Sequence, residues 1–285
     1  QPEDIADIIY FVIMGGSNLE GYHSKVLEHL QELVTEYNLQ LKFISADAPE
    51  ALAQISTLPT SLGIICPAEM KPFVSGIPVV NYGMSPFYFD SCFVQPDNFE
   101  GGILSGKLLL ENGHSKIYYV SNRSVDEDKK TDVNFEYMHF RQRYNGLCAA
   151  CEINGLAHPG FVRWHIKNQE SRRQVTELLT QVKNSAPKAP TALVIGNKSM
   201  ASEIYMIAIG MGIRIPEDLS IVSFIDRAEK RDDHISTIDF SRKAMAEQLL
   251  TIILSARNST TAINQNKHLL PMFLTNSDTI RNIKE

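Results

Sequence analysis

Residues 192–226 read ALVIGNKSMASEIYMIAIGMGIRIPEDLSIVSFID and contain a complete strand–helix–strand unit. The first four residues are apolar and predict a buried strand. The apolar positions that follow recur at helical spacing from Met200 to Met211, and Gly212 then ends the helix. A second apolar run, Leu219–Phe224, predicts the next strand. Units of this kind build parallel sheets, so the stretch predicts an α/β protein.

The same alternation runs through the rest of the chain. Apolar runs predict strands over Ile8–Ile13, Leu39–Ser45, Leu62–Cys66, Ile77–Tyr82, Lys116–Val120 and Gly160–Trp164. Helical patterns cover Tyr22–Tyr37, about Asp97 to Gly113, Arg141–Asn154 and Ser171–Lys183. The tail adds a strand over Ser236–Ile238, a helix over Arg242–Ala256, a surface loop over Arg257–Lys267 and a strand over Leu269–Leu274. Two successive runs of strand–helix units predict two doubly wound domains with a ligand between them.

The composition is that of a globular protein, with 44% hydrophobic and 21% charged residues. No window approaches the ~18 uninterrupted apolar residues that a membrane helix needs. No signal peptide is visible, although a mature form with its signal removed would look the same. The net charge is −6, whereas a domain that binds the phosphate backbone of DNA carries a basic face. We therefore expect no membrane association, and no DNA binding by this chain itself.

The sequence carries no catalytic or metal-binding signature. Gly15-Gly16-Ser17-Asn18 follows the first strand, but its spacing forms no phosphate-binding loop and predicts a tight turn. No nucleophile elbow or zinc-protease motif is present, and the eight histidines are scattered. We expect no enzyme activity, no catalytic residue, no metal and no cofactor.

The four cysteines, Cys66, Cys92, Cys148 and Cys151, are expected to be reduced, buried thiols. Cys148 and Cys151 form a nominal C-x-x-C pair, but it lies inside a helical pattern. A zinc site would also need two more ligands. The pair is therefore not interpreted as a redox or metal site.

Five blocks of sequence carry a family signature. They are Asp97-Asn98 at a helix start, Gly113-His114 before a strand, Arg143-x-x-Gly146 in a helix, Asn197-x-x-Met-Ala, and Gly212-Ile-Arg-Ile-Pro-Glu-Asp-Leu-Ser-Ile-Val. In this order they resemble the LacI/GalR family of transcription repressors over essentially the whole chain, and the last block is the most specific. The resemblance implies the effector-sensing, dimerising part of a cytoplasmic regulator with a type I periplasmic binding protein-like fold.

The resemblance also implies an organisation. The chain should cross between two subdomains near Asn122, Asp239 and Thr275. The N-terminal subdomain would be 1–121 and 240–274, and the C-terminal subdomain 122–239 and 275–285. Family members begin with a helix-turn-helix headpiece, and nothing of that kind precedes Ile8. Operator DNA should therefore be bound through a module absent from this chain. A homodimer is expected, with helices Val26–Val34 and Met245–Ile253 as candidate surfaces.

By the same resemblance, an effector lies between the subdomains and contacts Asp97, Arg143, Trp164 and Asn197. The planar fork of Arg143 would hold hydroxyls, a carboxylate or a phosphate; its alternative role is an interdomain ion pair. Trp164, the only tryptophan, would stack on the ligand or belong to the core. Asn197 would bind hydroxyls or cap the following helix, and Asp97 has the same two roles.

Four further candidates are less specific. Glu20, Tyr22 and His23 lie in the first strand-to-helix loop, which would line the cleft from the N-terminal subdomain, although such junctions are polar for capping reasons too. Phe240, near the second crossing, would pack on the ligand or on the hinge.

The sequence departs from the family at two positions that bear on the effector. Lys198 stands where the family usually has an acid, and Ile225 replaces the first carboxylate of a common pair, of which Asp226 remains. A charged stretch, Asp126–Asp132, is inserted before Arg143. The cleft therefore has fewer carboxylates and one more cation. This favours an anionic effector, a sugar acid or sugar phosphate, over a neutral sugar; alternatively, Lys198 points to solvent.

Two other functional classes stay open. An extracytoplasmic solute-binding protein of a sugar transporter shares the two-subdomain architecture, and a sugar- or nucleotide-modifying α/β enzyme is the third. The codons upstream would separate the first two hypotheses, because one requires a helix-turn-helix and the other a signal peptide.

Overall fold

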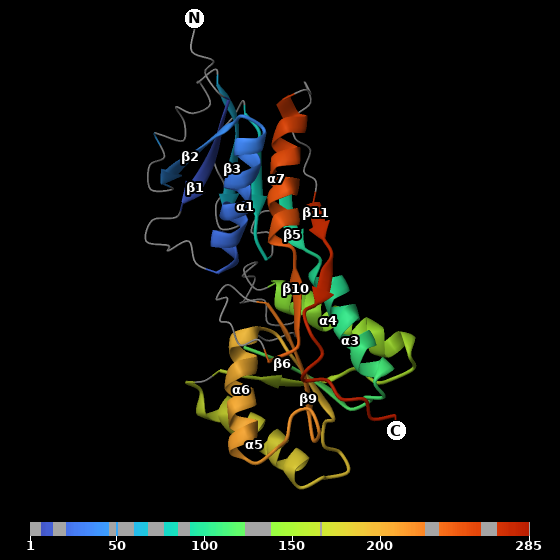
Figure 1. Ribbon diagram of the computed structural model, residues 1–285. Coiled ribbons are helices and arrows are strands. Elements are labelled where there is room, and N and C mark those ends of the chain that lie inside the picture. Colours follow the sequence, from blue (N-terminus) through green and yellow to red (C-terminus); the bar gives the residue numbers. More distant parts are fainter. Residues whose placement is uncertain are drawn as a thin grey trace, which may run out of the picture. The chain divides into compact units, whose positions relative to one another are not determined.

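The computed structural model describes residues 7–13, 21–45, 50, 60–67, 77–84, 92–122, 138–165, 167–225, 234–257 and 267–284. The chain divides into two compact units, each built from separate segments (Figure 1). Unit 1 comprises Gln1–Pro96 and Ser241–Leu270, and unit 2 comprises Asp97–Phe240 and Pro271–Glu285. Each unit has its own sheet, as the strand–helix alternation predicts.

Unit 1 contains a parallel sheet of six strands. In spatial order these are β11 (Lys267–Leu270), β5 (Cys92–Pro96), β4 (Val79–Tyr82), β3 (Ser61–Pro67), β1 (Ile8–Ile13) and β2 (Gln40–Ser45). The central strands are apolar on both faces and almost wholly buried, as parallel strands are when helices and loops cover them. β2 lies at the edge and is mostly exposed.

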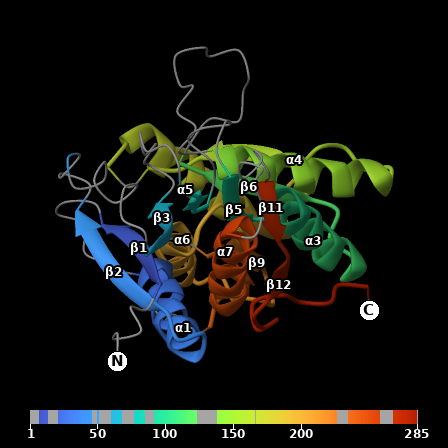
Figure 2. The same ribbon diagram turned by 90° about the horizontal axis from the view of Figure 1, so that it is seen from above.

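Two helices of unit 1 lie side by side, α1 (Tyr22–Glu36) and α7 (Arg242–Arg257) (Figure 2). Their apolar stripes face the sheet, and fully buried side chains include Val26, Leu30, Met245, Leu249 and Ile253. The two helix segments expected as dimer surfaces therefore supply core residues of unit 1. That expectation is wrong for these side chains, because an apolar stripe next to a sheet is buried by the sheet first.

Unit 2 contains the second sheet, in the order β12 (Met272–Leu274), β10 (Thr237–Phe240), β9 (Ser220–Phe224), β8 (Ala192–Ile195), β6 (Ile117–Ser121) and β7 (Gly160–Arg163). All neighbours are parallel except β12, which pairs antiparallel with β10 at the edge. The four residues of β8 alternate between two core clusters on opposite faces. The expected class, two doubly wound α/β sheets, is confirmed.

Four helices cover the sheet of unit 2. Helices α3 (Asn98–Glu111) and α4 (Met138–Ile153) pack closely together and contribute to one core cluster. Helices α5 (Gln169–Lys183) and α6 (Lys198–Gly210) contribute to the cluster on the other face (Figure 1). Cys148 and Cys151 lie inside α4, and all four cysteines are buried and free, as expected.

The most family-specific block has a structural explanation. Gly212 adopts a positive φ of 80° just after α6, a conformation that favours glycine, and so ends the helix. The Arg214 guanidinium and backbone N–H then donate to the Asp218 carboxylate, which lowers the pKa of Asp218 to about 2. Leu219 follows, fully buried, and leads into β9. The block is a tight helix-to-strand connection.

The other family block at a helix end, Gly113-His114, holds the C-terminal segment. His114 Nε2 lies 2.9 Å from the Arg281 carbonyl oxygen and 3.1 Å from Ser220 Oγ. Thr279 adds hydrogen bonds to β9 and to Ser236. The segment after β12 is thereby fixed to unit 2.

Three expectations about the chain's course need correction. The first unit boundary lies at Pro96/Asp97 and not near Asn122, because β6 pairs with β7 and β8 and α3 packs on α4. The later boundaries, after Phe240 and after Leu270, lie close to the expected crossings. The single strand expected over Leu269–Leu274 is two strands separated by Pro271. Strand β5 was missed.

Candidate functional site

Arg143 is the centre of the site in unit 2. Its side chain is fully buried, on α4. Nε donates to Asn98 Oδ1 at 2.9 Å, and Nη1 donates to the carbonyl oxygen of Gly196 at 2.6 Å. The guanidinium carbon lies 4.5 Å from the centre of the Phe224 ring. One guanidinium therefore joins the start of α3, the end of β8 and the end of β9.

The approach of α4 to α3 depends on glycine. A Cβ atom on Gly146 would lie 2.0 Å from the Phe99 carbonyl oxygen, and one on Gly102 would lie 2.2 Å from the Arg143 carbonyl oxygen. No side chain fits at either position. The Arg143-x-x-Gly146 motif is thus explained: the glycine brings the helices together, and the arginine reaches Asn98.

A layer of aromatic side chains accompanies Arg143. The Phe140 ring centre lies 5.9 Å from the guanidinium carbon, and the Tyr119 hydroxyl donates to the Phe140 carbonyl oxygen at 3.0 Å. Burial raises the pKa of Tyr119, and the charge of Arg143 opposes that rise. Tyr119 is therefore neutral at physiological pH. Its hydroxyl helps to hold the start of α4, from which Arg143 extends.

Asn197 and Asp97 both cap helices. Asn197 Oδ1 accepts from the Met200 backbone N–H at 2.8 Å at the start of α6. Asp97 Oδ1 accepts from the Glu100 backbone N–H at 3.0 Å at the start of α3. The capping alternative given for each residue is therefore present, and a ligand contact stays a prediction. Lys198 is the first residue of α6 and is half-buried.

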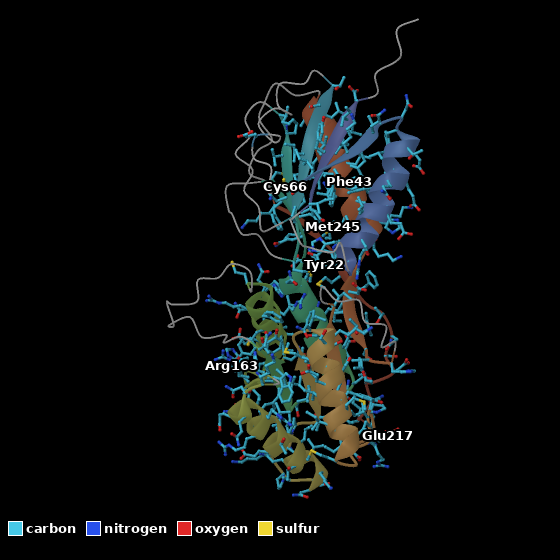
Figure 3. The ribbon with its side chains drawn as sticks, turned by 90° about the vertical axis from the view of Figure 1, so that its left-hand side faces the viewer. Tyr22, Phe43, Cys66, Arg163, Glu217 and Met245 are labelled. Carbon is cyan, nitrogen blue, oxygen red and sulfur yellow. The ribbon has the colours of Figure 1, made fainter. Side chains whose placement is uncertain are left out.

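Trp164 belongs to the core of unit 2. It directly follows β7, whose last residue, Arg163, is labelled in Figure 3. Its side chain is 1% exposed and lies in the cluster between the sheet and helices α5 and α6. The indole Nε1–H donates to the Glu203 carboxylate at 2.7 Å. The core alternative describes these contacts, and stacking on a ligand stays a prediction. Phe240, at the end of β10, is likewise buried.

Unit 1 has an aromatic group of its own at the start of α1. The Tyr22 and His23 rings stack with centres 4.0 Å apart, and His23 Nδ1 lies 2.9 Å from the Tyr82 hydroxyl. Burial raises the pKa of Tyr82. Tyr82 ends β4, and Tyr22 is labelled in Figure 3. Two of the three residues predicted in this loop, Tyr22 and His23, are therefore brought together with Tyr82, which sequence reasoning missed.

Some predicted positions lie outside the described residues. These are Glu20, Asp226 and the insertion Asp126–Asp132. Other members of the site were missed: Asn98, Gly196, Phe140 and Phe224. Asn98, Gly196 and Phe224 do lie in or beside family motifs, so the motif positions themselves were the available signal.

The described part of the chain has no cluster of three or more histidine, cysteine, aspartate or glutamate side chains that could hold a metal ion. Within the same residues, no helix is long and apolar enough to span a membrane.

Comparison with known proteins identifies the fold family. The model of the periplasmic binding protein-like domain matches residues 107–279. The chain belongs to this family. A curated relative, the HTH-type transcriptional repressor PurR of Histophilus somni, is 24% identical over 196 residues, which cover 68% of this chain and 53% of the repressor. PurR of Haemophilus influenzae is 30% identical over 165 residues, 56% of this chain and 44% of that protein. The chain thus spans about half the length of these relatives.

Solved structures of LacI-type proteins have the same fold as this chain. A LacI family regulator from Enterococcus faecium with bound ribose has a TM-score of 0.63 at 17% identity, covering 98% of this chain and 100% of that one. A periplasmic binding protein/LacI regulator from Alkaliphilus metalliredigens, complexed with D-xylulofuranose, has a TM-score of 0.64 at 16% identity, covering 96% and 99%. The predicted relationship to the ligand-binding domains of LacI/PurR-type regulators is confirmed.

Proposed function

We propose that this chain is the effector-binding and dimerising part of a cytoplasmic transcription regulator. It binds a sugar or sugar derivative in the cleft between its subdomains that the resemblance implies. Binding changes the affinity for operator DNA, which a module outside this chain contacts. Such coupling typically amounts to about 1–3 kcal/mol. The chain performs no chemical reaction on its effector.

The observation that carries this proposal is the setting of Arg143. Ligands of open α/β sheets bind beyond the carboxyl ends of the strands, and Arg143 contacts the ends of β8 and β9. Its anchoring by Asn98 and Gly196 holds the planar group in a fixed orientation. A guanidinium oriented in this way recognises hydroxyl, carboxylate or phosphate oxygens with directional hydrogen bonds.

The relatives support the regulatory class and the type of ligand. The curated relatives are transcriptional repressors. Two structural neighbours contain ribose and D-xylulofuranose. The buried, free cysteines agree with a reducing compartment and therefore favour a cytoplasmic regulator over an extracytoplasmic solute-binding protein.

We further propose that the effector is an anion, a sugar acid or sugar phosphate. Lys198 lies in the first turn of α6, where backbone N–H groups and the helix dipole also favour negative charge. Arg143 contacts the carbonyl of Gly196, two residues before Lys198. Two cations near one strand end select anions by charge-assisted hydrogen bonds.

The dimer of this proposal uses α6. Met206 and Ile209 are 67% and 43% exposed, and their spacing puts them on one side of the helix. A contiguous patch of exposed apolar side chains marks a contact with another chain, whereas single exposed apolar residues are ordinary. We propose that Met206 and Ile209 form the centre of such a patch. A second copy of this chain is the partner that we propose.

A thermal-shift panel of neutral sugars, sugar acids and sugar phosphates tests the function. A ligand at 100 times its dissociation constant stabilises the protein by about 2.7 kcal/mol. Arg143→Lys retains the charge but loses the fork, so stabilisation should largely disappear. Arg173→Lys, on the exposed side of α5, is the matched control and should respond like the wild type. Equal stabilisation of all three proteins would contradict the proposed role of Arg143.

A further inference from the structure

The hydrogen bond between the Trp164 indole and the Glu203 carboxylate connects two elements of unit 2. Trp164 follows β7, and its backbone N–H donates to the Ser121 carbonyl oxygen at 2.8 Å, which continues the pairing with β6. Glu203 lies in the second turn of α6 and is half-buried. The indole Nε1–H reaches its carboxylate at 2.7 Å. The bond therefore connects the end of strand β7 with helix α6, which contributes to the same core cluster.

Both partners are held independently of this bond. The Trp164 ring lies in a cluster with buried side chains of α5 and α6, among them Val175, Leu179 and Met200. The start of α6 is fixed by the Asn197 cap, and the α6 residues Ala201 and Ile204, on either side of Glu203, are buried. The hydrogen bond thus forms between two preorganised groups, so little side-chain freedom is lost on its account.

We propose that Glu203 is a positioning residue that fixes the orientation of the Trp164 indole. The neighbouring apolar side chains define the space that the ring occupies, and the carboxylate selects which edge of the ring faces α6. A hydrogen bond to a charged acceptor is stronger than one to a neutral acceptor, and a partly desolvated setting strengthens it further.

This arrangement has a consequence for specificity, which rests on the proposed function. The indole has a single N–H and no acceptor, and that N–H is directed to Glu203. Trp164 therefore gives an effector no hydrogen bond. Any contact that an effector makes with Trp164 is made with ring carbons, which favour the C–H-bearing side of a ligand. Hydrogen bonds to the polar groups of an effector are therefore made by other residues of the site.

Because Trp164 is the only tryptophan, its indole N–H gives one resonance in a ¹H–¹⁵N spectrum. Glu203→Ala should move this resonance upfield and accelerate its exchange with solvent by at least about tenfold, the factor that corresponds to about 1.4 kcal/mol. Glu203→Gln retains an acceptor oxygen and should give an intermediate result. Glu177→Ala removes a helix carboxylate that accepts from Arg173 instead, and should leave the resonance unchanged. An unchanged resonance and exchange rate in folded Glu203→Ala would overturn the proposal.

A second arm separates this inference from the proposed function. Trp164→Phe keeps an aromatic ring but has no donor. It should bind the best ligand of the thermal-shift panel within a few-fold of the wild type, and adding Glu203→Ala should change that affinity no further. A tenfold or larger loss in Trp164→Phe would overturn the specificity consequence. If no compound in the panel binds, the proposed function fails, whereas the indole resonance still tests Glu203 without any ligand.

Discussion

The contact between α3 and α4 gives the sharpest prediction about stability. Gly146→Ala adds one methyl group where the structure leaves no space. Its Cβ would lie 2.0 Å from the Phe99 carbonyl oxygen, about 1.4 Å short of the 3.4 Å at which ordinary van der Waals contact begins. The obstructing atoms are backbone atoms of α3, so a rotamer change cannot relieve the clash. The two helices must separate.

The separation has two costs. Overpacking a tight core typically costs about 1–3 kcal/mol. The hydrogen bond from Arg143 Nε to Asn98, 2.9 Å long, also stretches, and bonds to charged groups contribute about 1.5–3 kcal/mol. The higher helix propensity of alanine offsets this loss of stability by up to about 1 kcal/mol. We expect a net loss of about 3 kcal/mol, and a fall in Tm of about 6–12 °C for a unit of this size.

The assay is thermal and urea unfolding followed by circular dichroism. Gly210→Ala is the matched control, because a Cβ on Gly210 at the end of α6 meets nothing within 4 Å. It should leave stability unchanged or raise it by up to about 1 kcal/mol. A Gly146→Ala protein as stable as the wild type would refute the account of how α4 is positioned. An equal loss in Gly210→Ala would refute it too.

Three other predictions concern charge, assembly and pH. Lys198→Ala should weaken stabilisation by sugar acids and sugar phosphates; stabilisation by neutral sugars alone, undiminished in this variant, would contradict the anionic effector. The wild type should sediment as a dimer at tens of micromolar, and Met206→Glu should give a folded monomer; a monomeric wild type would rule out the dimer. Burial lowers the pKa of His114, and its Nδ1 has no hydrogen-bond partner among the described residues. The unfolded chain therefore takes up a proton that the folded one resists, so stability should fall as pH drops below ~6.5, the ordinary histidine value. His114→Gln should flatten this dependence in urea unfolding, and an unchanged slope would contradict it.

Local patterns predicted most elements of the fold. The run Ile8–Ile13 forms a strand with those bounds, and the helical stripe after it forms α1. Strand β5 was missed because its apolar run is short and ends in Gln95-Pro96. The boundary near Asn122 was misplaced because the assignment of α3 to a unit depends on its packing against α4, a contact that no local pattern encodes.

The sequence identified residues of the candidate site by their motif positions, but it did not predict which residues they contact. Arg143 was identified from its motif, whereas its partners Asn98 and Gly196 lie 45 and 53 residues away in the chain. Residue type alone left Asn197, Asp97 and Trp164 with two roles each. The structure assigns hydrogen-bond partners to all three within unit 2. Such choices depend on tertiary packing, which composition and periodicity do not specify.

Hydrogen–deuterium exchange with and without the best ligand of the thermal-shift panel tests the central claim most directly. Peptides that cover the Arg143 region of α4 and residues 196–200 at the start of α6 should exchange more slowly with ligand, because these backbones hold the guanidinium and the capped turn. The exposed side of α5, around Arg173, should exchange at an unchanged rate. Protection confined to α5, with α4 and the start of α6 unaffected, would contradict an effector site at Arg143.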